Sequence, residues 1–203
     1  ITRITRQRGK MQIAISEQET IVVPLSLFRE RPLTEGQPIN LEEYDNWLMV
    51  RQYRHALDRA VACLAARAHS KHEIEQKLLR VGYRPCTVEM VLYKLEREHL
   101  LNDADFARQW VEARSGRKLG RSRIAQELRR KGIDADEAEE ALSAIGEDAQ
   151  LADAIALAEK AAARAKSDED PRKTYQRIAA MLARRGFRWD ITKEALAQVL
   201  QAD

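Results

Sequence analysis

The chain has 203 residues, of which 33% are charged and only 5% are aromatic, and its formal net charge is +3. Its hydrophobic content of 44% excludes a disordered chain, and the small net charge argues neither for nor against a nucleic-acid partner. The length is enough for one or two compact domains or for a short array of repeats.

The N-terminal segment, 1–39, favours β-strands over its first 28 residues. Residues 8–10 and 16–19 have the composition of hairpin turns. The strand-forming side chains partly alternate with polar residues and are Ile1, Ile4, Met11, Ile13, Ile15, Ile21, Val22 and Val23. The pattern predicts a small antiparallel sheet of two or three strands. Such a sheet is marginal alone, so we expect it either to rest on helices or to move as a flap.

From residue 40 onward the composition is that of helices. Asn40 is a typical cap for a helix that continues to about Ala68, either unbroken or bent near residues 51–54. The apolar stripe predicted for this helix consists of Tyr44, Leu48, Tyr53, Leu57, Val61 and Leu64.

Two shorter helices complete a first repeat, 40–101. Ser70 and Glu73 form a capping-box pattern that opens the second helix, and Gly82 ends it, because glycine adopts the left-handed conformation most easily. Pro85 suits the first turn of the third helix. The buried residues predicted for the third helix are Val88, Val91, Leu92 and Leu95.

The end of this middle helix recurs twice more in the chain. Each copy has an isoleucine, a leucine four residues later, a glycine four residues after that, and then a bulky apolar residue. The copies are Ile74–Leu78–Gly82–Tyr83, Ile124–Leu128–Gly132–Ile133 and Ile178–Leu182–Gly186–Phe187. A period of roughly 50 residues predicts stacked supersecondary units. We therefore expect a mainly α protein with three tandem three-helix, helix-turn-helix-like repeats in an elongated curved array, plus the small N-terminal β segment. Such arrays bind macromolecules along open surfaces.

Repeat two, 102–146, begins with Asn102 as the cap of a helix that carries Phe106, Trp110 and Val111. A basic loop follows at 116–120. The middle helix is expected from Arg121 to Lys131, and a capping-box pattern at 134–137 opens the third helix.

Repeat three, 147–203, has an alanine-rich first helix and then an acidic break at 167–171. Its middle helix is expected over 172–185, with Gly186 as the stop. Asp190 is the expected cap of the last helix.

Positive charge concentrates in the middle helices of repeats two and three and in the loops beside them. Eight basic residues and one acid, Glu127, lie between Arg114 and Lys131, and six basic residues and no acid lie between Arg172 and Arg188. The candidate binding residues are Arg80, Arg114, Arg117, Lys118, Arg121, Arg123, Arg130, Lys131, Arg172, Lys173, Arg177, Arg184, Arg185 and Arg188.

An arginine stands two residues before the stop glycine in all three repeats, as Arg80, Arg130 and Arg184. If the repeats stack in register, these arginines form a row that suits an acidic protein surface or a phosphate backbone. The alternative is that cations simply favour helix C-termini and a solvated face.

No catalytic constellation and no cofactor motif is present in the sequence. The four histidines are scattered and are expected on the surface, and the two cysteines lack the spacing of a zinc site. Trp110 is expected in the core, and Trp189 is the best candidate for an exposed anchor. No run is long enough to cross a membrane, and the cysteine usage is typical of the cytoplasm.

Three motifs resemble the signatures of the RecX family, over roughly residues 53–200. They are Ser70-x-x-Glu73-Ile74-x-x-Lys77-Leu78-x-x-x-Gly82-Tyr83, Leu101-Asn102-Asp103-x-x-Phe106-Ala107-x-x-Trp110-Val111-x-x-Arg114 and Gly120-x-x-x-Ile124-x-x-Glu127-Leu128-x-x-Lys131-Gly132-Ile133. Repeat three departs from this pattern, with Met181 in the place of Glu127.

The resemblance implies a non-enzymatic regulator that binds the groove of the filament of the RecA recombinase on single-stranded DNA. It implies lower RecA ATPase, strand-exchange and coprotease activities, by filament end capping, subunit removal or groove blocking. We expect a cytoplasmic monomer without cofactor or membrane contact. The alternatives are a direct DNA-binding protein of helix-turn-helix-like repeats, or a helical adaptor for another ATPase.

Overall fold

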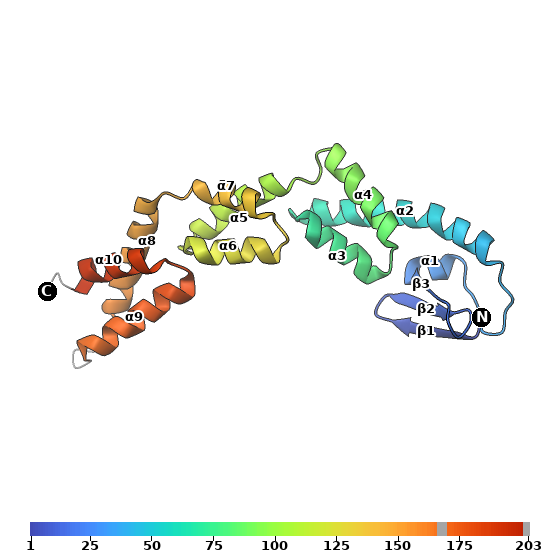
Figure 1. Cartoon of the computed structure of the whole chain (residues 1–203), viewed down its shortest axis with the longest axis horizontal. Coiled ribbons are helices and arrows are strands. Elements are labelled where there is room, and N and C mark those ends of the chain that lie inside the picture. The colour runs from blue at the N-terminus through green and yellow to red at the C-terminus, as the bar shows by residue number, and fades with distance from the viewer. Residues whose placement is uncertain (166–169, 201–203) are drawn as a thin grey trace. The chain divides into compact units, whose positions relative to one another are not determined.

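The computed structural model describes residues 1–165 and 170–200 (Figure 1). The chain divides into two compact units, Ile1–Asn102 and Asp103–Asp203. The first unit contains a small sheet and repeat one, and the second contains repeats two and three.

Unit one begins with a three-stranded antiparallel sheet in the order β1-β2-β3. The strands are β1 (Arg3–Gln7), β2 (Lys10–Ala14) and β3 (Thr20–Pro24). Arg8 and Gly9, between β1 and β2, both have positive φ angles, of 33° and 94°, which is typical of a tight two-residue hairpin turn. The predicted sheet is confirmed.

Helix α1 (Leu25–Glu30) was not predicted, because its residues belong to an apolar run that was interpreted as strand. A short apolar run gives no periodicity by which a helix can be distinguished from a strand. Pro24 ends β3, and Leu27 of α1 is fully buried.

Helix α2 (Leu41–Ala66) is unbroken, so the alternative of a bend is wrong. Tyr44 and Leu48 are buried as predicted, but the buried face then continues through Gln52, Ala56 and Ala60. Val61 is exposed, and the predicted residues Tyr53, Leu57 and Leu64 are only partly buried. The predicted stripe was misplaced because it followed the large apolar side chains, whereas alanines line much of the buried face of α2.

Helices α3 (Lys71–Val81) and α4 (Pro85–Arg97) complete repeat one. The Ser70–Glu73 capping box is present, and Gly82 has a φ angle of 101°. A Cβ atom on Gly82 would lie 3.0 Å from Lys10 Cβ of β2, so the sheet is seated directly on the end of α3.

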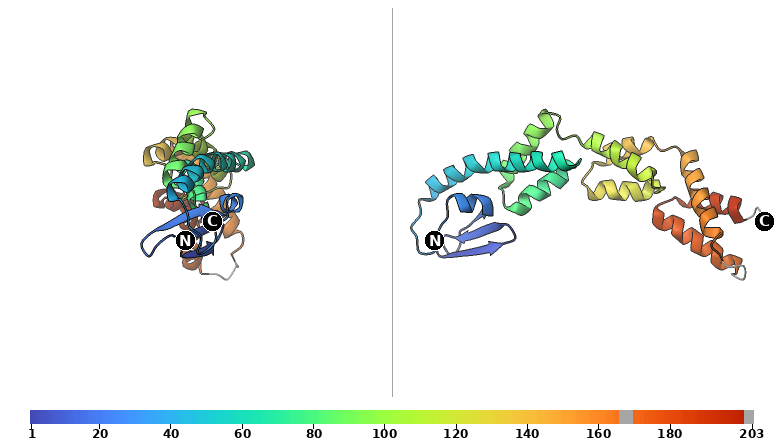
Figure 2. Two further views of the ribbon diagram at one scale, coloured as in Figure 1. Left: turned by 90° about the vertical axis from the view of Figure 1, so that its right-hand side faces the viewer. Right: turned by 180° about the vertical axis from the view of Figure 1, so that it is seen from behind.

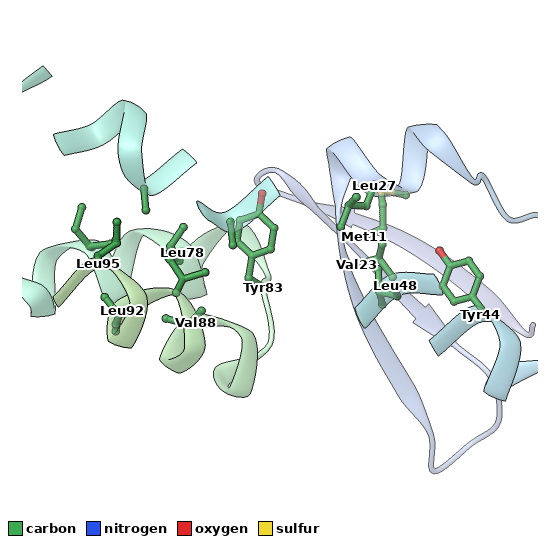
Figure 3. Packing of buried hydrophobic residues seen from close by; sticks show 14 of the residues in the cluster. Met11, Val23, Leu27, Tyr44, Leu48, Leu78, Tyr83, Val88, Leu92 and Leu95 are labelled. Atoms are coloured by element: carbon green, nitrogen blue, oxygen red, sulfur yellow. The ribbon is translucent and has the colours of Figure 1, made fainter. Parts of the chain in front are cut away.

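One continuous apolar core joins the sheet to the helices of unit one. Figure 2 shows α2 running past the sheet and α1 to reach α3 and α4. In Figure 3, Tyr83 lies between residues of the sheet side, such as Leu27 and Val23, and residues of the helical side, such as Leu78 and Leu95. The sheet therefore packs on the helices, in agreement with the first of the two expectations for it.

Unit two contains two three-helix repeats, each with a core of its own. Repeat two has α5 (Asp103–Ser115), α6 (Arg121–Arg130) and α7 (Ala135–Ser143). Repeat three has α8 (Glu147–Ala162), α9 (Pro171–Arg185) and α10 (Trp189–Leu200). The stop glycines Gly132 and Gly186 have φ angles of 75° and 89°, as predicted.

Two helix caps that were predicted in unit two differ from the structure. Asp134 caps α7, but its side chain accepts a hydrogen bond from Asp136 N at 2.9 Å, one residue earlier than in a capping box. Helix α10 begins at Trp189, so Asp190 lies inside its first turn and is not its cap. Of the acidic break predicted at 167–171, positions 167–169 lie outside the described residues, whereas Asp170 caps α9.

Repeats two and three are joined by backbone groups where the end of α9 meets the start of α6. Gly120 N donates to Arg185 O at 2.9 Å, and Ser122 N donates to Gly186 O at 3.2 Å. Arg121 N donates to Gln150 Oε1 of α8 at 3.0 Å. Unpaired N–H groups at a helix start and unpaired carbonyls at a helix end normally need partners. At this α9–α6 junction the two helix ends satisfy each other.

Glycine is required at the junction because the two backbones nearly touch. A Cβ atom on Gly120 would lie 2.2 Å from Gly186 C, a distance that no side chain tolerates. Gly120 has a φ angle of −71°, so this exclusion comes from contact and not from backbone strain.

We predict that Gly120→Ala lowers the free energy of unfolding of unit two by about 1–3 kcal/mol, because the added methyl group forces the junction apart. Thermal melting followed by circular dichroism measures this effect. Gly116→Ala, in the same loop, is the control, because its Cβ atom would make only an ordinary contact of 3.5 Å. Equal melting temperatures for the two variants would contradict the role of the junction.

Candidate interaction surface

The candidate surface lies on α6, α9 and the loop before α6, all in unit two. Helix α9 leads toward the start of α6 (Figure 1), and the junction fixes the two most basic helices of the chain end to end. Helix α6 has ten residues and is therefore about 15 Å long. Arg184, close to the junction, and Arg130, at the far end of α6, thus both lie in unit two.

Part of the predicted cationic set is engaged within unit two. Arg185 Nη1 donates to the backbone oxygens of Arg117 and Lys118 at 3.2 and 3.3 Å. Further contacts join Lys118 to Asp153 at 3.4 Å, Arg121 to Glu139, and Arg188 to Glu147 at 3.6 Å and to Asp190 at 2.6 Å. These side chains hold the loop, the junction and the helix starts, so their first role is structural.

A second engaged group surrounds Glu127 in repeat two. Its Oε2 atom accepts hydrogen bonds from Arg114 Nε at 2.7 Å and from Trp110 Nε1 at 3.1 Å. Arg123 Nε lies 3.5 Å from its Oε1 atom. The Arg114 guanidinium and the Lys131 ammonium lie 4.0 and 4.1 Å from the centroid of the Trp110 ring. These are cation–π distances, so both cations are attracted to the ring, and Arg114 is attracted to the carboxylate as well.

Trp110 was predicted in the core, and this is only partly right. Its ring stacks on buried Phe106, with centroids 5.7 Å apart, but Trp110 itself is half-buried. Arg114 and Lys131 cover the exposed part of the ring. Trp110 is therefore a bridge between the core of repeat two and its cationic surface.

The charges around Glu127 set its pKa. Burial alone would raise the pKa of this carboxyl group. The hydrogen bond and the charge of Arg114, with smaller contributions from Trp110 and Arg123, outweigh burial and hold the pKa below the ordinary value of 4.5. Glu127 is therefore ionised at neutral pH and keeps the cations around it in place.

The remaining predicted cations are exposed. Within residues 1–165 and 170–200, no ion pair engages the exposed side chains of Arg80, Arg117, Arg130, Arg172, Lys173 and Arg184. Arg177 is also exposed, on the middle of α9. In unit two the exposed set extends from the first turn of α9 to the last turn of α6, and we call Arg172, Lys173, Arg177, Arg184 and Arg130 the cationic strip. Arg80 lies in unit one, so its place in a common row stays a prediction.

Trp189 is exposed as predicted, with 63% of its surface accessible, at the first residue of α10. It directly follows Arg188 in the turn after Gly186. An exposed tryptophan beside arginines has the composition of an interface anchor, a role that remains a prediction.

Two residues important to this geometry carried no signal in the sequence. Gln150 and Gln52 are buried, and each accepts a hydrogen bond from the backbone N–H at a helix start, Arg121 N for Gln150 and Arg84 N for Gln52. A glutamine on a helix is normally expected in solvent. Only the position of a partner helix reveals the need for a buried acceptor.

The expectation of surface histidines is wrong for His69, which is buried. Its Nδ1 atom lies 3.0 Å from Arg67 O, and its Nε2 atom lies 2.8 Å from Lys77 Nζ. Burial, the largest cause, lowers the pKa of His69, and the charges of Arg67 and Lys77 act in the same direction. Neutral His69 thus accepts from Lys77 as a packing residue.

The described part of the chain contains no group of three or more histidine, cysteine, aspartate or glutamate residues placed to hold a metal ion. Over the same residues, every helix is too short or too polar to cross a bilayer.

Three domain models of one family match the chain in sequence order. The first three-helix domain of RecX matches residues 56–95, the second matches 102–142 and the third matches 148–196. The chain is 30% identical over 207 residues to the regulatory protein RecX of Clostridioides difficile (strain 630), covering 100% of this chain and 97% of that protein. It is 38% identical over 141 residues to the regulatory protein RecX of Mycobacteroides abscessus, covering 66% and 68%.

Two solved structures are similar to the chain. The crystal structure of RecX from Lactobacillus salivarius has a TM-score of 0.68 at 26% identity, over 74% of this chain and 97% of that chain. A crystal structure of a regulatory protein RecX has a TM-score of 0.69 at 22% identity, over 100% and 99%, and supports the fold alone.

We predict that Glu127→Gln lowers the free energy of unfolding at pH 7 by about 1–3 kcal/mol, because Arg114 loses its ionic partner while Trp110 keeps an oxygen acceptor. Because folding lowers the pKa of Glu127, its contribution is complete above 4.5 and is lost as the pH falls through the folded-state pKa. The stability gap between wild type and variant should therefore narrow in acid. Denaturant unfolding from pH 7 to pH 3 measures it.

The control is Glu112→Gln, on the exposed side of α5. It should unfold like the wild type at each pH. If the difference in unfolding free energy between the wild type and Glu127→Gln stays constant down to pH 3, the charge of the Glu127 carboxylate does not stabilise the surrounding group of side chains.

Proposed function

The chain belongs to the RecX family of regulatory proteins, and from this premise we propose that it binds the RecA–single-stranded DNA filament as a monomer and inhibits it. Inhibition would lower the ATPase, strand-exchange and coprotease activities of RecA. The protein would act by binding alone, without a cofactor and without catalysis of its own.

The observation that carries the proposal is the cationic strip. Several cations of unit two, among them Arg114, Arg121 and Arg188, are paired within the fold. Arg130 and Arg184 are exposed at the ends of α6 and α9. Each such contact with an acidic protein surface or a phosphate is weak. Several contacts on one compact unit act together, because the first raises the effective concentration of the next.

Binding in the filament groove is the route that fits a strip of this kind best. A protein that blocks the groove is needed in proportion to RecA, whereas a protein that caps filament ends is needed only in proportion to the number of ends. The amount of protein at full inhibition therefore separates the two routes.

Direct binding to duplex DNA by a helix-turn-helix mode is disfavoured by charge. In that mode the second helix of the motif enters the major groove. The equivalent helix of repeat two is α7, which carries Asp136, Glu137, Glu139 and Glu140. Burial raises the pKa of Glu137, and the negative charges of Asp103 and Asp134 nearby raise it further. Phosphates would be repelled from this face.

We predict that titration of the protein into RecA on single-stranded DNA lowers the rate of DNA-dependent ATP hydrolysis. Inhibition by groove binding should saturate near a fixed ratio to RecA, and that ratio should not change when the DNA is cut into shorter pieces. An unchanged ATPase rate at stoichiometric excess would contradict the proposed function.

We predict that Arg130→Glu combined with Arg184→Glu weakens inhibition at least about tenfold, because two exposed contacts become repulsive. Helicity should be retained and the melting temperature should fall only slightly, since neither side chain forms an ion pair among the described residues and the variant loses only the interaction of each cation with its helix dipole.

The matched control is Arg51→Glu combined with Arg54→Glu, on the exposed side of α2. It changes the net charge by the same amount but leaves the strip intact, so it should inhibit like the wild type. Equal inhibition by both double variants would mean that the strip is only a solvated face.

A further inference from the structure

Unit one exposes apolar side chains on the outer face of α4. Met90 and Tyr93 are 58% and 61% exposed, although they stand one helical turn apart on a helix whose other face is fully buried. We call this pair the α4 ridge. Contiguous exposed apolar side chains on a soluble protein often mark an interaction site.

Comparison of the repeats indicates that the fold does not require this ridge. Counted from the stop glycine, the core position of Leu92 stays a leucine in all repeats, as Leu142 and Leu196. The outward positions differ. Met90 corresponds to Glu140 and Glu194, and Tyr93 corresponds to Ser143 and Ala197. The same three-helix unit therefore forms with polar or small residues there, and the ridge is specific to repeat one.

Two hollows flank the ridge. The hollow between α3 and α4 has a volume of about 640 Å³ and is floored by apolar residues that include Leu79, Val88 and Leu92. The hollow on the side of α2 has a volume of about 380 Å³ and includes Tyr53 and Arg97. Met90 and Tyr93 line both hollows. A partner seated on the ridge would thus find an apolar depression on each side.

The rim of the larger hollow is acidic. It carries Glu75, Glu89 and Glu96 against one cation, Lys71, which is 2.7 Å from Glu96. Among the described residues, Glu75 faces only His72 at 3.6 Å, and Glu89 forms no ion pair. Two carboxylates beside an apolar floor therefore remain without a permanent cationic partner.

We propose that the α4 ridge and the α3–α4 hollow dock an apolar protein segment that carries a lysine or arginine. The apolar side chains of the segment would cover Met90 and Tyr93, and its cation would lie between Glu75 and Glu89. The proposal rests on the proposed function, so the segment belongs to RecA. Repeat one would then bind its partner through an acidic and apolar site, whereas the cationic strip binds through positive charge.

Nucleic acid does not fit this site, because two carboxylates at the rim repel phosphate. An anionic lipid surface is disfavoured for the same reason. A basic, apolar protein segment satisfies both the carboxylates and the exposed apolar area, which is the usual composition of a docked peptide and its groove.

The first test is Met90→Glu combined with Tyr93→Ser, which places the residues of repeat two at the same positions of repeat one. Because α7 folds with these residues, melting should be unchanged. The Kd for the RecA–single-stranded DNA filament, measured by sedimentation, should rise by about tenfold or more, since two exposed apolar anchors are lost. Wild-type affinity in this variant would overturn the proposal while leaving the proposed function intact.

The second test is Glu75→Gln combined with Glu89→Gln, which removes the charge but not the shape of the rim. If a basic segment occupies the site, the variant should bind the filament more weakly than the wild type. If a phosphate backbone occupies it, the variant should bind more tightly, and this result would overturn the proposal. The control is Glu140→Gln on α7, which should bind like the wild type. If the wild-type chain itself does not bind the filament, the proposed function and the docking proposal both fail.

Discussion

Mutual satisfaction of helix ends is the constraint on which the candidate surface depends. A helix leaves N–H groups unpaired at its start and carbonyls unpaired at its end, and burial of either without a partner is costly. At the α9–α6 junction the carbonyls of Arg185 and Gly186 receive the N–H groups of Gly120 and Ser122. The negative C-terminal end of α9 and the positive N-terminal end of α6 also attract each other there. The contact is made by backbone groups and links the two repeats, whose apolar cores are separate.

Charge in unit two serves two purposes. One set of cations stabilises the fold: Arg114 and Lys131 cover Trp110, and Arg185 binds the loop before α6. The other set, represented by Arg130 and Arg184, is left exposed in the last turns of α6 and α9. A position in the last turn favours a cation in either case. Exposure of the side chain, and not the mere presence of arginine, is what marks the residues we assign to binding.

Much of the fold was predictable because its strongest signals are local. Gly82, Gly132 and Gly186 all have positive φ, as the repeated motif predicted, since glycine alone adopts that conformation at little cost. The family resemblance is confirmed by the three matched domains. Helix α1 was missed because six residues give no period, and the face of α2 was misplaced because Ala56 and Ala60 are buried where larger residues were expected. The sequence could not show which candidate cations are paired and which are exposed. Arg114, for example, is paired with Glu127, which lies on a different helix.

We propose that exposed cations on repeats two and three bind the RecA filament by electrostatic attraction. The most direct measurement is the affinity of the wild-type chain for a preformed RecA–single-stranded DNA filament over a range of salt concentrations. We expect measurable binding that weakens steadily as the salt concentration rises, because exposed charges are screened. Binding that is absent at low salt, or that does not change between low and high salt, would contradict the proposal.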